Sequence, residues 1–264
     1  MTEIEGKRIV VKVGTSTLTH RTGRFNIRLV EQLVKVLADL QNAGNEIILV
    51  SSGAIGLGMG RLGMRERPKD TPSKQACAAI GQCELMQMYS KLFDEYNLVV
   101  AQVLLTKYIL TSERVQLVEN AMESIIAKGV IPIINENDTV AIDELELEVG
   151  ENDSLAAIVG SIAKADLLII LSDIEGLYDK DPHKYPDAKR YTHVGEITSE
   201  IRDSAGGSGS IFGTGGMRTK LNAVEIAYQA GLDVVLMNGS QPRDLYDLLE
   251  GKEIGTYFHC PEYF

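Results

Sequence analysis

The feature that most constrains this chain is a regular alternation between short apolar segments and longer segments with helical periodicity. Each short segment is apolar at consecutive positions rather than at every second one, which is typical of parallel strands buried on both faces. Helical segments between such strands place helices on both sides of one sheet. The sequence therefore predicts an α/β fold, a three-layer αβα sandwich with a mainly parallel central sheet. The predicted strands lie at residues 8–13, 46–50, 98–105, 130–135, 167–173 and 233–239.

The predicted helices carry apolar residues at helical spacing and have recognisable ends. In residues 26–43, apolar side chains recur every three or four positions, and Gly44 ends the helix. Asp153 is a good N-cap for the helix that follows it. Further helices are expected at residues 112–128, 217–230 and 242–250, and a long one opens at Ser73.

Two segments depart from this pattern. In residues 140–149 apolar residues alternate with acids, which predicts a half-exposed antiparallel ribbon. The glycine-rich segment Gly56–Pro72 predicts a loop that closes on a ligand and touches a neighbouring subunit, with an ordinary surface loop as the alternative. No linker clearly separates two domains, so we expect residues 1–264 to form one domain with two lobes.

The composition excludes several classes of function. The 264 residues hold 26 Lys and Arg against 37 Asp and Glu, a formal net charge of −11, which argues against a nucleic-acid partner. No apolar run approaches the ~18 residues of a membrane span, and no signal peptide is visible. Three cysteines without a CxxC pair and four scattered histidines offer no zinc-site spacing. We therefore expect a cytoplasmic protein without a membrane contact or a metal held by protein ligands.

Polar and glycine residues collect where four of the predicted strands end. In open α/β sheets the ligand lies outside the carboxyl ends of the strands, so these residues predict one shared cleft. The four strand ends are residues 12–16 (KVGTS), 51–54 (SSGA), 135–138 (NEND) and 172–173 (SD).

Three charged residues suggest what this cleft binds. Lys12 interrupts an apolar strand and would be costly to bury unpaired, so it is expected to point into the cleft, with an edge-strand lysine as the alternative. The tract Gly213–Lys220 precedes a helix, where backbone N–H groups and Lys220 can hold a phosphate; a flexible surface loop is the alternative. Asp153 is either an ordinary N-cap or the acid that positions both lysines. Such an arrangement suits phosphoryl transfer.

Other nucleotide-binding and catalytic motifs do not fit. Gly58–Gly63 matches the pattern GxGxxG, but it lies well past the strand at 46–50 instead of directly at its end. The following strand also lacks the acid that would hold a ribose, so a nicotinamide site is disfavoured. Neither the P-loop pattern GxxxxGK[ST] nor the GxSxG elbow of serine hydrolases occurs.

Six segments of the chain carry a resemblance to a known family: VVKVGTSTLT (10–19), SSGAIGLG (51–58), INENDTV (134–140), GENDSLAA (150–157), SDIEGLYDKDP (172–182) and GTGGMRTK (213–220). Together they resemble the amino acid kinase family, and the resemblance covers essentially the whole chain from Arg8 to residues 254–258. It implies ATP-dependent phosphorylation of the γ-carboxylate of L-glutamate, the first step of proline biosynthesis. Another kinase of the family, acting on N-acetylglutamate, aspartate, carbamate or a nucleoside monophosphate, is the nearest alternative. A catalytically silent amino-acid or nucleotide sensor is the second.

The resemblance also implies roles for individual residues. Lys12 and Lys220 would stabilise the phosphates, Asp153 would organise both lysines, and ATP would enter as its Mg²⁺ complex, the metal carried mainly by the nucleotide phosphates. The implied glutamate-binding residues are Ser52, Asp138 and Asn152. The implied nucleotide-binding residues are Lys12, Ser172, Asp173, Thr214, Gly215, Gly216, Met217, Arg218, Thr219 and Lys220.

The same resemblance implies an organisation and partners. Residues 1–165 would form the amino-acid lobe and residues 166–264 the nucleotide lobe, without the C-terminal PUA domain that many relatives carry. Proline would be a feedback inhibitor, and the enzyme would assemble as a homodimer or homotetramer. Because a carboxylate is already ionised at neutral pH, the reaction needs no general base, and the motifs accordingly hold no histidine.

Overall fold

The computed structural model describes residues 6–20, 22, 24–106, 109, 113–141, 152–182, 184–204 and 216–261. Within these residues the strands form one eight-stranded sheet in the order β3-β4-β2-β1-β5-β7-β8-β6. All neighbouring strands pair in parallel except β7 and β8, which are antiparallel. The predicted mainly parallel sheet is thus confirmed. The strands are β1 (Arg8–Val13), β2 (Glu46–Ser51), β3 (Val100–Leu105), β4 (Ile131–Glu136), β5 (Leu167–Ser172), β6 (His193–Val194), β7 (Asp233–Asn238) and β8 (Thr256–Phe258).

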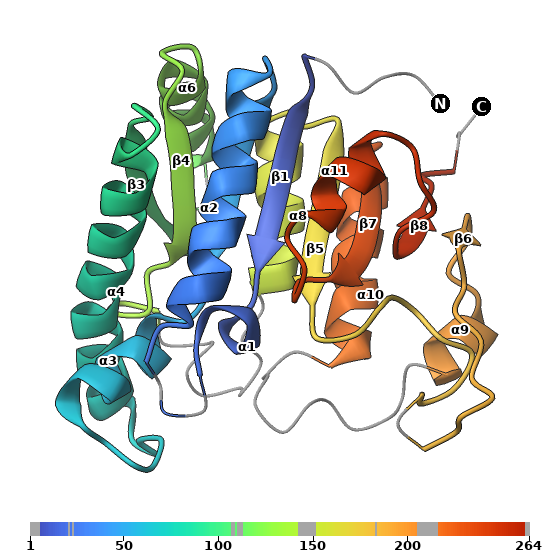
Figure 1. Cartoon of the computed structure of the whole chain (residues 1–264), viewed down its shortest axis with the longest axis horizontal. Helices are drawn as coiled ribbons and strands as arrows, with labels where there is room; N and C mark the ends of the chain where they lie inside the picture. Colours follow the sequence, from blue (N-terminus) through green and yellow to red (C-terminus); the bar gives the residue numbers. More distant parts are fainter. Residues whose placement is uncertain are drawn as a thin grey trace.

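Helices cover both faces of this sheet, as the three-layer prediction requires. The α2, α4 and α11 helices pack on one face, and α6, α8 and α10 pack on the other. In Figure 1, α2 lies on the viewer's side of the sheet and α8 lies behind it. The helices are α1 (Thr15–Leu18), α2 (Ile27–Asn42), α3 (Ala54–Leu62), α4 (Thr71–Asp94), α6 (Val115–Ile126), α8 (Asn152–Ile162), α9 (Ser199–Ser204), α10 (Met217–Gln229) and α11 (Asp244–Leu249).

The two cores explain why the strands are apolar at consecutive positions. In β1, Ile9 and Val11 point to the α2 side, whereas Val10 points to the α8 side. The same division holds along β5, where Ile169 and Ile170 belong to opposite cores. Because successive side chains of a strand face opposite sides, a central strand under two helical layers needs apolar residues throughout.

The glycine-rich segment Gly56–Pro72 differs from its prediction as a loop, because its first part is the end of α3. The glycines serve packing instead: a Cβ on Gly58 would lie 1.9 Å from the carbonyl oxygen of Cys77, and one on Gly81 would lie 1.7 Å from that of Ala54. No side chain fits in that space, so α3 and α4 approach each other with their backbones in near contact. The pattern GxGxxG in this segment is therefore part of a helix pair.

Other boundaries differ slightly from the sequence-based expectations. The long helix begins at Thr71 rather than at Ser73, because Asp70 caps it by accepting a hydrogen bond from the backbone N–H of Ser73. The short strands β6 (two residues) and β8 (three residues) were not predicted, since so few residues carry no clear periodicity. The predicted ribbon at residues 140–149 lies mostly outside the described residues.

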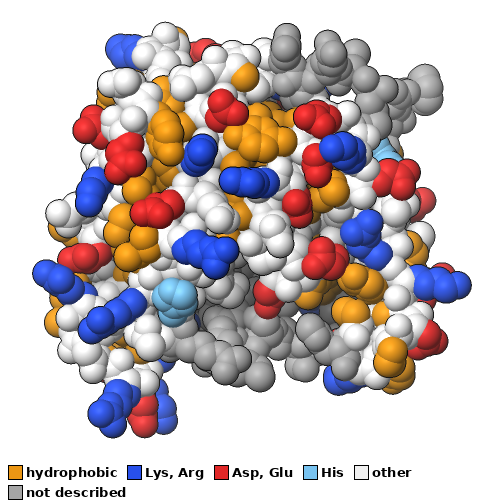
Figure 2. All heavy atoms as spheres, viewed as in Figure 1, with side chains coloured by type: hydrophobic (Ala, Val, Ile, Leu, Met, Phe, Trp, Pro, Cys, Tyr) orange, Lys and Arg blue, Asp and Glu red, His pale blue; other side chains and the backbone are white. Residues whose placement is uncertain are grey.

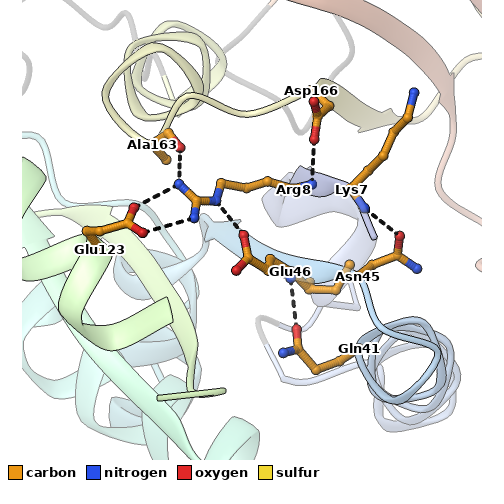
Figure 3. Close-up of polar contacts among 9 residues, drawn as sticks. Lys7, Arg8, Gln41, Asn45, Glu46, Glu123, Ala163 and Asp166 are labelled. Atoms are coloured by element: carbon orange, nitrogen blue, oxygen red, sulfur yellow. Dashed lines mark hydrogen bonds and ion pairs between the residues drawn. The ribbon is translucent and has the colours of Figure 1, made fainter. Parts of the chain in front are cut away.

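The amino ends of the strands are joined by Arg8, on the edge opposite the predicted cleft (Figure 3). Its guanidinium donates to Glu46 at the start of β2 (2.7 Å) and to Glu123 in α6 (2.9 Å). It also donates to the carbonyl oxygen of Ala163, just after α8. The Arg8 backbone N–H donates at 2.7 Å to Asp166, the residue that directly precedes β5. One side chain thus ties two strands to two helices of the α8 layer.

The surface mixes both signs of charge despite the acidic balance. On the face shown in Figure 2, Lys and Arg alternate with Asp and Glu over most of the molecule. Basic side chains gather only at the lower left of that view, over the connection from α3 to α4, where Arg61, Arg65, Arg67 and Lys69 are exposed. A search of the described helices for a candidate membrane span finds none.

Candidate active site

The carboxyl ends of the central strands meet where the sequence places its polar motifs. The β1 strand lies between β2 and β5, and its last residue, Val13, pairs with Ser51 on one side and Leu171 on the other. On the far side of β2, Val50 pairs with Ile134 of β4. Segments that are far apart in the chain therefore end at one edge of the sheet, the lower edge in Figure 1.

Lys12, Asp153 and Lys220 meet at this edge as a buried cluster. Lys12 Nζ lies 2.6 Å from Asp153 Oδ1, and Lys220 Nζ lies 3.4 Å from Asp153 Oδ2. The exposed fractions are 7% for Lys12, 2% for Asp153 and 8% for Lys220, so all three charges are removed from bulk water. Because β1 is a central strand, the alternative interpretation of Lys12 as an edge-strand lysine is wrong.

Three elements bring these charges together. Lys12 comes from β1, Asp153 from the first turn of α8, and Lys220 from the first turn of α10. Since α8 begins at Asn152, Asp153 is its second residue and not the N-cap that the sequence predicts.

The electrostatics of the cluster keep Asp153 ionised. Burial alone would raise the pKa of this carboxyl, but the ammonium groups of Lys12 and Lys220 outweigh burial and hold the pKa below its ordinary value of 3.8. Two positive charges then share one buried negative charge. Positive charge at a strand end suits an anion such as a phosphate.

The predicted acceptor residues Ser52 and Asn152 are in direct contact. Asn152 Nδ2 donates to Ser52 Oγ at 2.8 Å and to Asn135 Oδ1 at 3.0 Å. Asp138 follows β4 in a turn and is half-buried. The structure thus joins two of the three predicted acceptor residues and leaves the third on the adjacent strand end.

The predicted nucleotide residues are only partly described. Ser172 is buried at the end of β5, and its hydroxyl donates to Asp173, which is exposed (3.2 Å). Gly216 is the N-cap of α10, and the Thr219 hydroxyl donates to its carbonyl oxygen (2.8 Å). Met217 is half-buried and Arg218 is exposed. Thr214 and Gly215 lie outside the described residues.

Two contributors were missed by the sequence analysis as site residues. Asn135 belongs to a strand-end motif but received no role, although it accepts the hydrogen bond from Asn152. Gln82 of α4 accepts a hydrogen bond from Asn135 Nδ2 at 2.9 Å. No spacing or motif marks a lone glutamine inside a helix, so only the structure reveals Gln82.

A metal site formed by protein side chains is not found in the part of the chain that the structure describes. There, no group of three or more His, Cys, Asp or Glu side chains converges as metal ligands. Asp153, the most buried acid of the cleft, has its carboxylate directed at two lysines instead.

Comparisons with known proteins show which family the chain belongs to. A model of the amino acid kinase family matches residues 7–238. The chain belongs to the amino acid kinase family. Its relatives in this family include the glutamate 5-kinase of Clostridium perfringens, which is 52% identical over 257 residues and 96% of each chain. The glutamate 5-kinase of Lactococcus lactis subsp. lactis is 50% identical over 96% of this chain and 95% of its own length.

Solved structures support the family assignment at the level of fold. Carbamate kinase from Giardia lamblia superimposes with a TM-score of 0.69 at 18% identity, covering 97% of this chain and 99% of its own. UMP kinase from Ureaplasma parvum has a TM-score of 0.66 at 15% identity, covering 97% and 100%. Kinases named for different substrates thus share the architecture, so the fold does not by itself specify the acceptor.

Proposed function

We propose that this chain is a glutamate 5-kinase, which transfers the γ-phosphoryl group of ATP to the γ-carboxylate of L-glutamate and forms L-glutamyl 5-phosphate in the first step of proline biosynthesis. The observation that carries the proposal is the buried Lys12–Asp153–Lys220 cluster at the carboxyl edge of the sheet. It stands in a chain that is about half identical to glutamate 5-kinases over nearly its full length.

The chemistry follows from the charges that the site must bring together. The acceptor carboxylate is ionised at neutral pH and attacks phosphorus without a general base. The barrier arises instead from bringing a carboxylate against a triphosphate. Lys12 and Lys220 offset this repulsion by holding the phosphoryl oxygens, while Asp153 fixes both ammonium groups in position.

Acceptor recognition falls to Ser52, Asn152 and Asp138. The first two lie in hydrogen-bond contact at 2.8 Å at the end of β2 and the start of α8. An acid beside a dicarboxylate substrate is favourable only near its α-ammonium group, so Asp138 is assigned to that group. Glutarate, which lacks the amine, is therefore expected to be a poor acceptor.

The nucleotide belongs on the other side of the cluster. Ser172, Asp173 and residues 214–220 hold ATP, so that the acceptor lobe (1–165) and the nucleotide lobe (166–264) meet at Lys12. Mg²⁺ arrives with the phosphates, and Asp153, the buried acid of the described cleft, is engaged by Lys12 and Lys220. When bound, the metal neutralises phosphate charge, and the protein supplies the lysines around it.

Proline and oligomerisation complete the proposal. Proline shares the α-carboxylate and a cationic nitrogen with glutamate but lacks an acceptor carboxylate, so it competes at the glutamate site or one that overlaps it. The enzyme works in the cytoplasm as a homodimer or homotetramer.

The test is an acceptor panel with purified protein, in which ADP release is measured with glutamate, glutarate, N-acetylglutamate, aspartate, carbamate and UMP. The proposal predicts that glutamate is the best acceptor by kcat/KM. A higher kcat/KM with another member of the panel would overturn the acceptor assignment, and ADP release that does not depend on any acceptor would overturn the kinase assignment.

A further inference from the structure

A chain of side-chain hydrogen bonds, buried at its α4 end, runs from α4 to the acceptor residues. Gln82 Oε1 accepts from Asn135 Nδ2 at 2.9 Å, and Asn135 Oδ1 accepts from Asn152 Nδ2 at 3.0 Å. Asn152 Nδ2 also donates to Ser52 Oγ at 2.8 Å. Four elements are linked in this way, because the residues come from α4, β4, α8 and the end of β2.

The chain leaves complementary groups for an amino acid. Asn152 Nδ2 donates hydrogen bonds to Asn135 and Ser52, so Asn152 Oδ1 is the atom left to accept one. The Ser52 hydroxyl accepts from Asn152, which leaves its own proton to donate. One acceptor and one donor side by side match the α-ammonium and the α-carboxylate of an amino acid.

Asn135 holds this arrangement only if its amide is fixed at both ends. Its Oδ1 accepts from the backbone N–H of Glu136 at 2.9 Å, which sets the direction of the amide. Its Nδ2 points into the α4 side of the core, where Gln82 Oε1 is the acceptor. With Asn135 2% exposed, water does not replace this partner without a rearrangement.

The environment of Gln82 indicates that its polar group matters more than its size. Gln82 is 9% exposed, and its Nε2 has no hydrogen-bond partner among the described residues. An apolar side chain of similar size would avoid that unpaired donor. The same helix reaches the acceptor edge a second time two turns later, where Tyr89 contacts Ser51 Oγ at 3.0 Å.

We propose that Gln82 is a positioning residue for the acceptor amino acid, acting through Asn135 to hold Asn152 and Ser52 in the orientation that binds its α-ammonium and α-carboxylate groups. The inference rests on the proposed function. It assigns to the middle of α4, a helix outside the sequence motifs, an effect on acceptor affinity that acts through Asn135.

The test compares Gln82→Met with two controls on the same helix, by steady-state kinetics with glutamate and ATP varied separately and by thermal unfolding. Leu85→Ala removes a fully buried apolar side chain one turn away and reports the effect of destabilisation alone. Gln87→Met makes the same chemical change at an exposed position. For Gln82→Met we expect the KM for glutamate to rise roughly tenfold while the KM for ATP changes less than about twofold.

A second variant, Gln82→Glu, gives a readout that a structural role would not produce. A protonated carboxyl keeps the acceptor oxygen for Asn135, and burial favours this neutral form. As the pH rises from about 6 to about 9, ionisation places a negative charge near the glutamate carboxylates, so the KM for glutamate should climb more steeply than in the wild type.

The outcomes separate this inference from the proposed function. If wild-type protein turns over glutamate and Gln82→Met leaves the ratio of the two KM values unchanged, or matches Leu85→Ala in that ratio, the positioning role is wrong and the function stands. If wild-type protein uses another acceptor, the proposed function fails, and the same variants are measured with that acceptor. A selective rise in the KM for it would still support the positioning role; no such rise would overturn it.

Discussion

Replacing Asp153 by Asn removes one negative charge from between two buried ammonium groups while keeping the size of the side chain. Asp153 is 2% exposed and contacts Lys12 at 2.6 Å and Lys220 at 3.4 Å. In the variant the two positive charges remain buried without their counter-charge. Removal of one partner of a buried ion pair costs about 3–5 kcal/mol.

That cost is large for a protein of this size. The free energy of unfolding of natural domains is about 5–15 kcal/mol. For chains of about 150–250 residues, a loss of about 1 kcal/mol lowers the unfolding temperature by roughly 2–4 °C. Asp153→Asn should therefore lower the unfolding temperature by about 6–20 °C. Asp94→Asn, the same change at an exposed position, should stay within about 0.5 kcal/mol of the wild type.

The assay is urea unfolding of four proteins that form a double-mutant cycle: wild type, Asp153→Asn, Lys12→Met and the double variant. In Asp153→Asn, Lys12 and Lys220 both lose the carboxylate between them, and Lys12→Met removes one of these two ammonium groups. The loss of unfolding free energy in the double variant should therefore be smaller than the sum of the two single losses, by at least about 1 kcal/mol. An Asp153→Asn variant that loses less than about 1 kcal/mol, or a cycle that is additive, would refute the electrostatic account of the cluster.

The pH dependence follows from the lowered pKa of Asp153. A carboxyl whose pKa is depressed by folding stabilises the protein above its unfolded value of 3.8, and this contribution disappears as the pH falls through the folded pKa. The difference in stability between wild type and Asp153→Asn should thus be constant from about pH 5 to pH 8 and shrink only below about pH 3.8.

Three further predictions concern other parts of the molecule. Gly81→Ala should destabilise the protein by about 1–3 kcal/mol or more and raise the KM for glutamate, because the new Cβ would press α3, which follows Ser52, away from α4. Cys83→Ala, at an exposed position of α4, is the control. An unfolding temperature of Gly81→Ala equal to that of the wild type would contradict the packing argument. Arg8→Lys should lower the free energy of unfolding, measured by chemical denaturation, by about 1–3 kcal/mol with kcat unchanged, since a lysine cannot contact Glu46 and Glu123 together. A loss of kcat without a loss of stability would argue against a structural role. Proline should raise the glutamate concentration for half-maximal rate in initial-rate assays, whereas inhibition that glutamate cannot overcome would indicate a separate site.

The charged cluster could be predicted from the sequence because its residues violate local expectations. A lysine inside an apolar strand needs a partner, and Lys12 has one in Asp153. Lys220 follows a glycine tract at the start of a helix, which is a recognisable setting for a cation in an anion site. Most strands and helices were predictable for a similar reason, since burial on one or both faces imposes a period on the sequence.

The other features of the fold and the site depend on tertiary contacts that no local sequence pattern indicates. Glycines are typical of loops, so Gly58 and Gly81 gave no sign that two helix backbones pack in near contact. Gln82 resembles any polar residue of an amphipathic helix, and its role arises only when the fold brings it to Asn135, 53 positions away. Asp153 was expected at the N-cap because Asp favours that position, but Asn152 already lies in the helix and tertiary ion pairs use the carboxylate.

The most direct test of the central claim is to trap the acyl phosphate with hydroxylamine and measure γ-glutamyl hydroxamate in wild type, Lys12→Ala and Lys220→Ala. Wild-type protein should form hydroxamate in step with ADP, and only when ATP and glutamate are both present. Each folded lysine variant should form it roughly 10²-fold more slowly, because the lysines stabilise the transferring charge. ADP release without hydroxamate, or near-normal turnover by a folded Lys220→Ala protein, would contradict the assignment of phosphoryl transfer to this cluster.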